Sequence, residues 1–230
     1  MGIKERQERD REAVRRAILD AARELFVSEG FQNVSIRKIA ERIEYSPAAI
    51  YGYFPSKDDI FFALAEEGFR LLGDPATIST DPLHHAAPPI ERVRAIFKRM
   101  YAFSREHGEY FALMFVDRSV PRIGREYERF AFAREMKRHI VAEIQAAVDD
   151  ATLPTTLDPI VATRMLFAGL LGVAVLRLSD RLAPGESADD LAADVLNVML
   201  AGLASGTPLR SIGVEIDCAV ADPLANAHAS

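Results

Sequence analysis

The segment SPAAIYGYFPSKDDIF, residues 46–61, predicts a very short helix that ends abruptly and is followed at once by a second one. Ser46 is a typical N-cap residue, and Pro47 suits the first helical position because an N–H there would have no partner. Pro55 disfavours helical geometry in the residue before it, so the short helix ends there. Ser56, followed three residues later by an aspartate, resembles a capping box and predicts the start of the next helix. A helix this short has to fold within a larger unit.

The residues before this segment predict two further helices. Apolar residues recur at steps of three and four over residues 11–29, and a glycine then ends an amphipathic helix. Ser35 is an N-cap candidate for a short second helix. The buried face of that second helix would consist of Ile36, Ile39, Ala40 and Ile43. Two short helices this close together, with Ile50 and Phe54 packing the second against the first, form a helix-turn-helix over about residues 35–54 that can present one helix to the DNA major groove.

Composition is that of an ordinary globular protein with one or two domains. Of the 230 residues, 49% are hydrophobic and 27% are charged, which is enough apolar material for a buried core. The longest uninterrupted apolar run, residues 165–176, is shorter than the roughly 20 residues that cross a bilayer, and the charged amino terminus does not resemble a secretory signal. A single cysteine, Cys218, cannot form an internal disulfide. We therefore expect a cytoplasmic protein.

Charge is distributed unevenly along the chain. The net charge is −6, but residues 1–57 contain 11 lysines and arginines against 9 acidic residues. Six of these basic residues lie within the first 16 positions. The asymmetry places a nucleic-acid contact at the amino-terminal end. One hypothesis is that the basic tail enters the minor groove of DNA, and the alternative is an ordinary solvated tail.

The string AILDAARELFVSEGFQNVSIRKIAERIEYSPAAIYGYFPSKDDIF, residues 17–61, resembles the amino-terminal domain of the TetR family of one-component transcriptional regulators. The similarity extends over about residues 12–72 and includes paired alanines and a Leu-Phe in the first helix and an Ile-Tyr pair in the third. It implies an all-α fold in which a three-helix helix-turn-helix DNA-binding domain, residues 1–72, precedes a larger helical ligand-binding and dimerisation domain. In this family the tyrosine-bearing helix is the recognition helix.

Side-chain chemistry gives these residues distinct roles in DNA binding. The phenol of Tyr51 can reach a phosphate oxygen, and Lys57 adds a charge beside the backbone donors of a helix start. Arg37 can bind guanine through two hydrogen bonds, while the small residues of the recognition helix can touch thymine methyl groups. Tyr53 has an equally weighted alternative as a half-buried wedge between helices. The predicted DNA-binding residues are Ser35, Arg37, Lys38, Pro47, Ala48, Ala49, Tyr51, Tyr53 and Lys57.

Two features depart from the pattern of the family. Glu44 stands where most relatives have glycine, so the turn either holds a non-glycine residue at positive φ or closes in another way. Ala48, Ala49 and Gly52 offer no side-chain hydrogen bond to a base. We therefore expect DNA shape and phosphate contacts to carry more of the specificity than usual.

The sequence changes character after the fourth predicted helix. Residues 73–89, GDPATISTDPLHHAAPP, are rich in proline and small polar residues and predict a linker. Helical periodicity returns over residues 90–206, which we interpret as the second domain. Residues 207–230 give no clear signal and form a tail, for which disorder is one interpretation. The long helices predicted in the second domain cover residues 122–150, 157–182 and 187–205.

Aromatic, methionine and histidine side chains of the second domain could line one cavity. Such a cavity would suit a small, mostly apolar molecule with one polar handle. For each residue alone, ordinary core packing is the better interpretation, but the resemblance favours a pocket for the group. The predicted ligand-binding residues are Phe97, Met100, Tyr101, Tyr110, Met114, Phe132, Met136 and His139.

The last two predicted helices are apolar and contain small residues that permit close helix approach. In TetR-like proteins the corresponding helices pair with their copies, and a homodimer would bring two recognition helices to a palindromic operator about 34 to 36 Å apart or a multiple of that spacing. A ligand that binds better when the two heads are wrongly spaced must weaken DNA binding by the same factor. This predicts a repressor released by its ligand. A ligand that favours the DNA-competent spacing would reverse the sign and strengthen DNA binding, and the sequence leaves both alternatives open.

Two other classes of function are alternatives. A helical adaptor would bind only protein through its apolar helices and would ignore duplex DNA. An all-helical enzyme is less favoured, because the sequence contains no glycine-rich phosphate loop, no activated-serine motif and no histidines at metal-ligand spacing to acidic partners. We expect no cofactor, no metal and no membrane partner.

Overall fold

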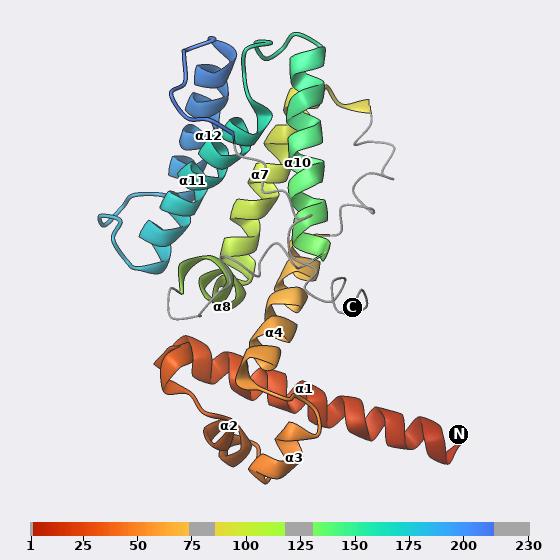
Figure 1. Ribbon diagram of the computed structural model, residues 1–230. Coiled ribbons are helices and arrows are strands. Elements are labelled where there is room, and N and C mark those ends of the chain that lie inside the picture. Colours follow the sequence, from red (N-terminus) through yellow and green to blue (C-terminus); the bar gives the residue numbers. More distant parts are fainter. Residues whose placement is uncertain (1, 74–85, 118–130, 214–230) are drawn as a thin grey trace, which may run out of the picture.

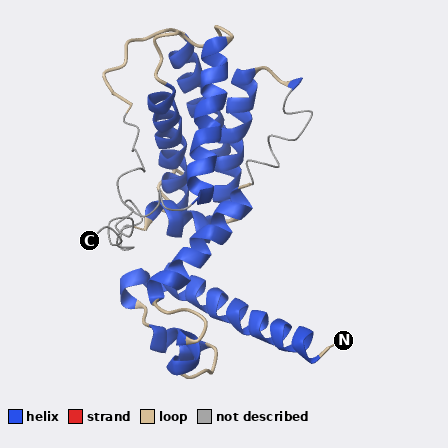
Figure 2. Cartoon of the chain, turned by 45° about the vertical axis from the view of Figure 1, so that its right-hand side comes forward, coloured by secondary structure: helices blue, strands red, loops and turns tan. Residues whose placement is uncertain are grey.

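The computed structural model describes residues 2–73, 86–117 and 131–213. Every regular element within these residues is helical, which confirms the predicted all-α fold. The chain forms a small head and a larger body (Figures 1 and 2). The head contains α1 (Ile3–Glu29), η1 (Phe31–Asn33), α2 (Ile36–Arg42), α3 (Pro47–Tyr51) and the first half of α4 (Lys57–Leu72). The body contains the rest of α4, α7 (Pro89–Glu106), α8 (Gly108–Phe111), η2 (Ala112–Val116), α10 (Ala131–Asp149), α11 (Pro159–Leu178) and α12 (Ala188–Ala204).

The short helices of the head begin at the serines that the sequence predicts. The hydroxyl of Ser35 accepts the N–H of the third residue of α2, and Ser46 does the same for α3 with Pro47 at the first helical position. Ser56 caps α4 by accepting the N–H of Asp59 at 3.1 Å, while its hydroxyl donates to the Asp59 carboxylate at 2.7 Å. In this variant of the capping box, the hydroxyl of Ser56 makes both hydrogen bonds with Asp59, one with its backbone N–H and one with its carboxylate.

The turn between α2 and α3 adopts the left-handed conformation at Glu44. Its φ is 61°, so the expectation of a non-glycine residue at positive φ is confirmed. The turn is closed by backbone hydrogen bonds, including one from the N–H of Tyr45 to the carbonyl of Ala40 at 2.9 Å. A side chain at positive φ brings Cβ close to the backbone, so this residue is strained relative to glycine.

Apolar and aromatic residues fill the interior of the head. The ring centres of Phe26 and Phe31 are 5.0 Å apart, and those of Phe31 and Phe61 are 5.6 Å apart, so three rings join α1, η1 and α4. Ile50 and Phe54, predicted as core residues, are buried. The other fully buried large side chains of the head are Ile18, Ile39, Ile60 and Leu64.

Helix α4 connects the head to the body (Figure 1). Its buried residues begin with Ile60 and Phe61 in the head and continue to Phe69 and Leu72 in the body. Gly68 lies at the crossing with the body, where an added Cβ would collide with the sulfur of Met114. The two units therefore share one continuous helix, and a larger residue at position 68 would force the side chain of Met114 to move.

The body is a bundle of long helices around a core of phenylalanine, leucine and small aliphatic residues. Helix α7 contacts α10, α11 and α12, and α11 packs along α12. At Gly169 of α11 an added Cβ would collide with the sulfur of Met199 of α12, so this pair of helices is closely spaced. The most deeply buried apolar residues of the body are Val93, Phe97, Phe111, Ile144, Ala147, Ala162, Leu166 and Ala174.

Helix α11 is long and apolar enough to span a membrane by length and composition. It has 20 residues, and its most apolar 18-residue window has a mean hydropathy of 1.9, with 33% of that window buried inside the molecule. A core helix of a bundle meets the same criteria, and α11 contacts three other body helices. Its outward-facing side is mostly apolar, since its exposed residues are Arg164, Ala168, Gly172, Leu176 and Leu178.

Some sequence predictions fall on residues outside the described ranges. Of the predicted linker, residues 74–85 lie there, and so do residues 122–130 of the long helix predicted at 122–150 and the tail beyond residue 213, with Cys218. Helix α1 begins eight residues earlier than predicted, at Ile3 rather than at residue 11. The predicted boundaries of the two domains stay predictions.

Candidate functional site

Helix α3 lies at the surface of the head that faces away from the body (Figure 1). Ile50 is fully buried and anchors the helix to the head core, while Tyr51, the next residue, is 55% exposed. Pro47 and Ala48 are exposed and Ala49 is half-buried, and none of the three has a bulky side chain. The outer surface of α3 is therefore nearly flat, with one projecting phenol. Such a surface allows the backbone of a binding partner to approach closely.

Three predicted DNA-binding residues lie at the start of α2. Arg37 has an 81% exposed side chain and forms an ion pair with Glu41 one turn later, at 2.8 Å. The hydrogen bond to Glu41 raises the pKa of the Arg37 guanidinium, so the charge is permanent. Ser35 is exposed but uses its hydroxyl oxygen to cap α2, and Lys38 forms an ion pair with Glu29 of α1. Of these three residues, Arg37 is therefore the one whose charge points into solvent.

Lys57 does not project its charge as the sequence analysis expects. Its Nζ donates to the carbonyl oxygens of Phe31 at 2.7 Å and Val34 at 2.9 Å, and it lies 4.1 Å from the centre of the Phe31 ring. Burial lowers the pKa of this ammonium group. Two of its three N–H donors are occupied inside the head by carbonyls at the start of η1 and just after it, and the Phe31 carbonyl also accepts the N–H of Val34. Lys57 therefore braces the connection between α1 and α2.

Tyr53 is half-buried at the end of the short helix and packs against the head core. The guanidinium carbon of Arg11, from α1, lies 5.9 Å from the centre of its ring. The neighbouring Phe54 has the guanidinium of Arg15 over its ring at 5.4 Å. This position matches the interpretation of Tyr53 as a half-buried wedge between helices. The rings of Tyr53 and Phe54 also place two arginines of α1 close to α3. Sequence reasoning missed Arg11, because nothing local links it to residues more than forty positions later.

The predicted ligand-binding residues occupy the interior of the body. Within the described side chains, seven of the eight can be placed, and Phe132 cannot. Tyr110 and Met114 come together against Gly68 of α4. Tyr101 is directed elsewhere, because its hydroxyl donates to Asp189 at the start of α12 at 2.9 Å. Six of these side chains are buried and His139 is half-buried; the buried ones are Phe97, Met100, Tyr101, Tyr110, Met114 and Met136.

Polar groups in this part of the body are largely satisfied by one another. Burial and the hydrogen bond to Asp189 raise the pKa of Tyr101 to about 12. Glu143 of α10 pairs with Arg92 of α7 at 2.7 Å, and both side chains are mostly buried. These pairs tie α7 to α10 and to α12, so the interior is closed by specific contacts between helices.

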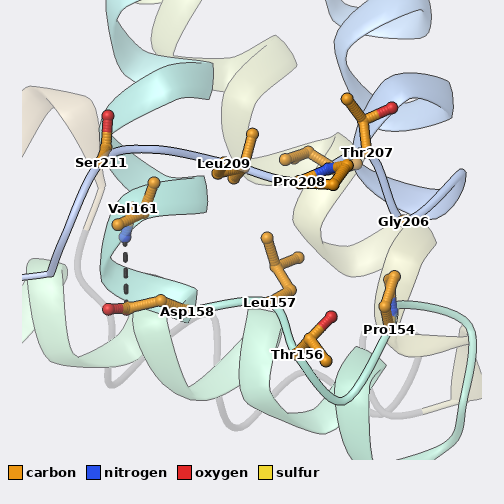
Figure 3. A pocket seen from close by; sticks show the side chains of 11 residues that line it. Pro154, Thr156, Leu157, Asp158, Val161, Gly206, Thr207, Pro208, Leu209 and Ser211 are labelled. Carbon is orange, nitrogen blue, oxygen red and sulfur yellow. Dashed lines mark hydrogen bonds between the residues drawn. The ribbon is translucent and has the colours of Figure 1, made fainter.

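Figure 3 shows a cavity of about 360 Å³. Its walls come from the connection between α10 and α11, the start of α11, the end of α12 and the segment that follows α12. The end of α10, the start of α11 and the end of α12 lie at the end of the body distant from the head (Figure 1). Asp158 caps α11 and also accepts the N–H of Gly213 at 3.0 Å, which holds the following segment across the opening. None of the predicted ligand-binding residues lines this cavity. Sequence reasoning did not detect it because residues 207–213 were assigned to a tail.

Two family models match the chain. The model described as bacterial regulatory proteins of the tetR family matches residues 18–64, and the model of tetracyclin repressor-like C-terminal domains matches residues 93–199. The chain belongs to the TetR family. Its head is the helix-turn-helix DNA-binding domain of a transcriptional regulator, and α3 lies within the matched residues.

Individual TetR-family relatives agree with this assignment. The HTH-type transcriptional repressor Rv1474c of Mycobacterium tuberculosis is 44% identical over 55 residues, which cover 24% of this chain and 29% of that protein. The match thus spans less than a third of the relative's length. A TetR/AcrR-family regulator from Thermobifida fusca is 26% identical with a TM-score of 0.55, covering 83% of this chain and 98% of that one. FadR from Bacillus subtilis, solved with stearoyl-CoA, has a TM-score of 0.64 at 16% identity and covers 81% of this chain and 97% of its own.

Proposed function

We propose that this TetR-family regulator is a homodimeric repressor that binds a palindromic operator through α3 and releases it when a small, mostly apolar molecule binds in the body. The observation that carries the proposal is the placement of α3. Its buried side is anchored by Ile50, and Tyr51 is exposed on a helix that lies at the surface of the head opposite the body (Figure 1). A short helix held in this way can enter a major groove without reorganising the head.

Some exposed side chains of the head would position the protein on the DNA, and others would read the bases. Tyr51 can donate to a phosphate oxygen, which fixes the register of the head on the duplex. Arg37 can exchange its exposed partner Glu41 for the O6 and N7 acceptors of a guanine. The flat surface at Pro47 and Ala48 supports close contact with thymine methyl groups and with groove shape.

The homodimer is supported by an apolar stripe on the outside of α11 and α12. Ala168, Gly172 and Leu176 are exposed at four-residue spacing on α11, so they share one helix face. On α12, Val198 is 70% exposed. Two copies that paired through these helices would bury the stripe in a four-helix interface and would set the distance between the two heads.

The effector is proposed to bind among the buried methionine and aromatic side chains of the body. Met100, Met114 and Met136 come from three different elements, and methionine adapts its shape to a ligand more readily than branched residues do. Met114 also touches α4 at Gly68. A ligand that displaces Met114 would therefore move α4, which continues into the head. If the ligand weakens DNA binding by some factor, linkage requires that DNA weakens ligand binding by the same factor.

The decisive experiment measures binding of the purified full-length protein to the DNA upstream of its own coding region. We expect a protected site with two-fold symmetry and an affinity that falls steeply with salt. Tyr51→Ala should weaken binding with little loss of thermal stability, because the side chain is exposed. Leu71→Ala, an exposed apolar residue on α4, is the matched control and should bind as the wild type does.

Two further measurements test the dimer and the effector. Val198→Glu should convert the protein to a monomer in sedimentation experiments, since a carboxylate would be buried in the interface. Addition of apolar compounds, with stearoyl-CoA as one of the probes, should release the operator. A protein that ignores every duplex while staying dimeric would contradict the proposal and favour the adaptor alternative. The proposed site of action is the cytoplasm, where the operator is accessible.

A further inference from the structure

The first turns of α1 project from the head as an exposed helix. Residues 4–13 are all exposed, and Figures 1 and 2 show this end of α1 extending beyond the other head helices. Ten helical residues span about 15 Å. A helix about 10 to 12 Å wide does not fit a groove about 6 Å wide, so in this helical form the segment would contact the DNA backbone rather than enter the minor groove.

Basic residues on this projecting helix are divided between two faces. Lys4, Arg11 and Arg15 are separated by seven and four positions, so they share one face, with Glu8 between the first two. Arg6 and Arg9 lie on the far side of the helix. Arg16, at the end of the segment, is engaged by the carboxylates of Asp20 and Glu67 at 2.9 and 2.5 Å.

Contacts with the end of the short helix fix the orientation of the first face. Arg11 lies over the ring of Tyr53 and Arg15 over the ring of Phe54, at 5.9 and 5.4 Å. Both rings directly follow α3, so this face of α1 is on the same side of the head as the recognition helix. A guanidinium stacked on a ring keeps its in-plane N–H donors available for another group. Arg15 also has a carboxylate partner, Glu12, at 3.5 Å.

We propose that Lys4 and Arg11 bind phosphates of the DNA backbone beyond the groove that α3 occupies, so that the start of α1 lengthens the operator contact. This inference rests on the proposed DNA binding by α3. The two residues are about 10 Å apart along the helix, at 1.5 Å per residue, so they reach different phosphates. Charge complementarity and continuity with α3 identify the partner as nucleic-acid backbone rather than a base edge.

The position of the projecting helix also indicates which phosphates it contacts. In Figure 1 the amino-terminal end of α1 points to the side of the molecule opposite α11 and α12. If α11 and α12 form the dimer interface, each projecting helix points away from the two-fold axis. Lys4 and Arg11 then contact the outer flanks of the operator, outside the two half-sites.

The test compares two double variants of the full-length protein. Lys4→Gln with Arg11→Gln removes both charges from the face beside α3. Arg6→Gln with Arg9→Gln removes the same charge from the opposite side of the same helix and is the matched control. Operator affinity is measured as a function of salt on a long duplex and on a duplex trimmed at both outer flanks. Circular dichroism confirms that helix content is equal in all three proteins.

The expected result separates this inference from the proposed function. Each lost phosphate contact lowers the slope of log affinity against log salt by about 0.9, so the Lys4/Arg11 variant should lose about 3 to 4 units of slope as a dimer. Trimming the flanks should weaken the wild type and the control but not this variant. Equal slopes for the two variants, or equal sensitivity to trimming, overturn the inference while leaving α3 binding intact. A wild type that binds no duplex overturns both.

Discussion

Arg23 of α1 and Tyr110 of α8 are joined by two interactions across the boundary between head and body. The Nη1 of Arg23 donates to the Tyr110 hydroxyl at 2.9 Å, and its guanidinium carbon lies 5.2 Å from the centre of the ring. The same guanidinium lies 3.1 Å from the carboxylate of Glu109. This contact links the two units independently of α4. Any rotation of the head relative to the body has to strain or break it.

Replacement of Tyr110 by phenylalanine isolates the hydrogen-bonded part of this contact. Tyr110→Phe removes the hydroxyl but keeps the ring, so the stacking with Arg23 stays. Hydrogen bonds to charged groups contribute about 1.5 to 3 kcal/mol, and we expect the free energy of unfolding in urea to fall by about 1.5 kcal/mol. The control is Tyr45→Phe, at an exposed tyrosine in the turn before α3. If both variants unfold at the wild-type urea concentration, the hydrogen bond does not stabilise the boundary.

Lys57 gives a second prediction, because its two possible roles have different consequences. Lys57→Met removes the ammonium group from the carbonyls of Phe31 and Val34 and keeps the aliphatic stem. The Phe31 carbonyl keeps the N–H of Val34, but the Val34 carbonyl loses its ammonium partner. An unpaired buried carbonyl costs about 1 to 3 kcal/mol, so we expect a loss of stability of that size. The salt slope of operator binding should stay unchanged. A stable variant with a reduced slope would show instead that Lys57 contacts phosphate, as the sequence analysis expects.

Lys57 also shows which features of the structure can be predicted from the sequence and which cannot. The starts of α2, α3 and α4 could be predicted because each depends on a serine and on backbone groups within three residues of it. The direction of Lys57 could not, since its partners lie 23 and 26 residues away. The start of α1 was placed too late because periodicity detects apolar residues, and its first turns are charged. The cavity beside Asp158 depends on a segment without any periodic pattern.

Alkaline pH provides a test of the contact between α7 and α12. Burial raises the pKa of Tyr101 from 10.0 to about 12, so the folded protein holds this proton more tightly than the unfolded chain does. The resulting stabilisation is present below pH 10 and is lost as the pH rises from 10 towards 12. Tyr101→Phe has no such proton. We therefore expect the difference in unfolding free energy between wild type and Tyr101→Phe to shrink between pH 9 and pH 11.5, and a constant difference would contradict the assignment.

Glu44 gives the last prediction, because its positive φ combines strain with a position next to the recognition helix. At φ 61° a Cβ is unfavourable by about 1 to 2 kcal/mol, and glycine lacks it. Part of that gain is offset because glycine is more flexible in the unfolded chain, so Glu44→Gly should raise the unfolding free energy by about 0.5 kcal/mol. Glu44→Ala keeps the Cβ and should bring no gain. A stabilised alanine variant would show that the glutamate charge, and not the backbone angle, limits this turn. Operator affinity should be equal in the wild type and the glycine variant, since the turn already holds α3 in the same position.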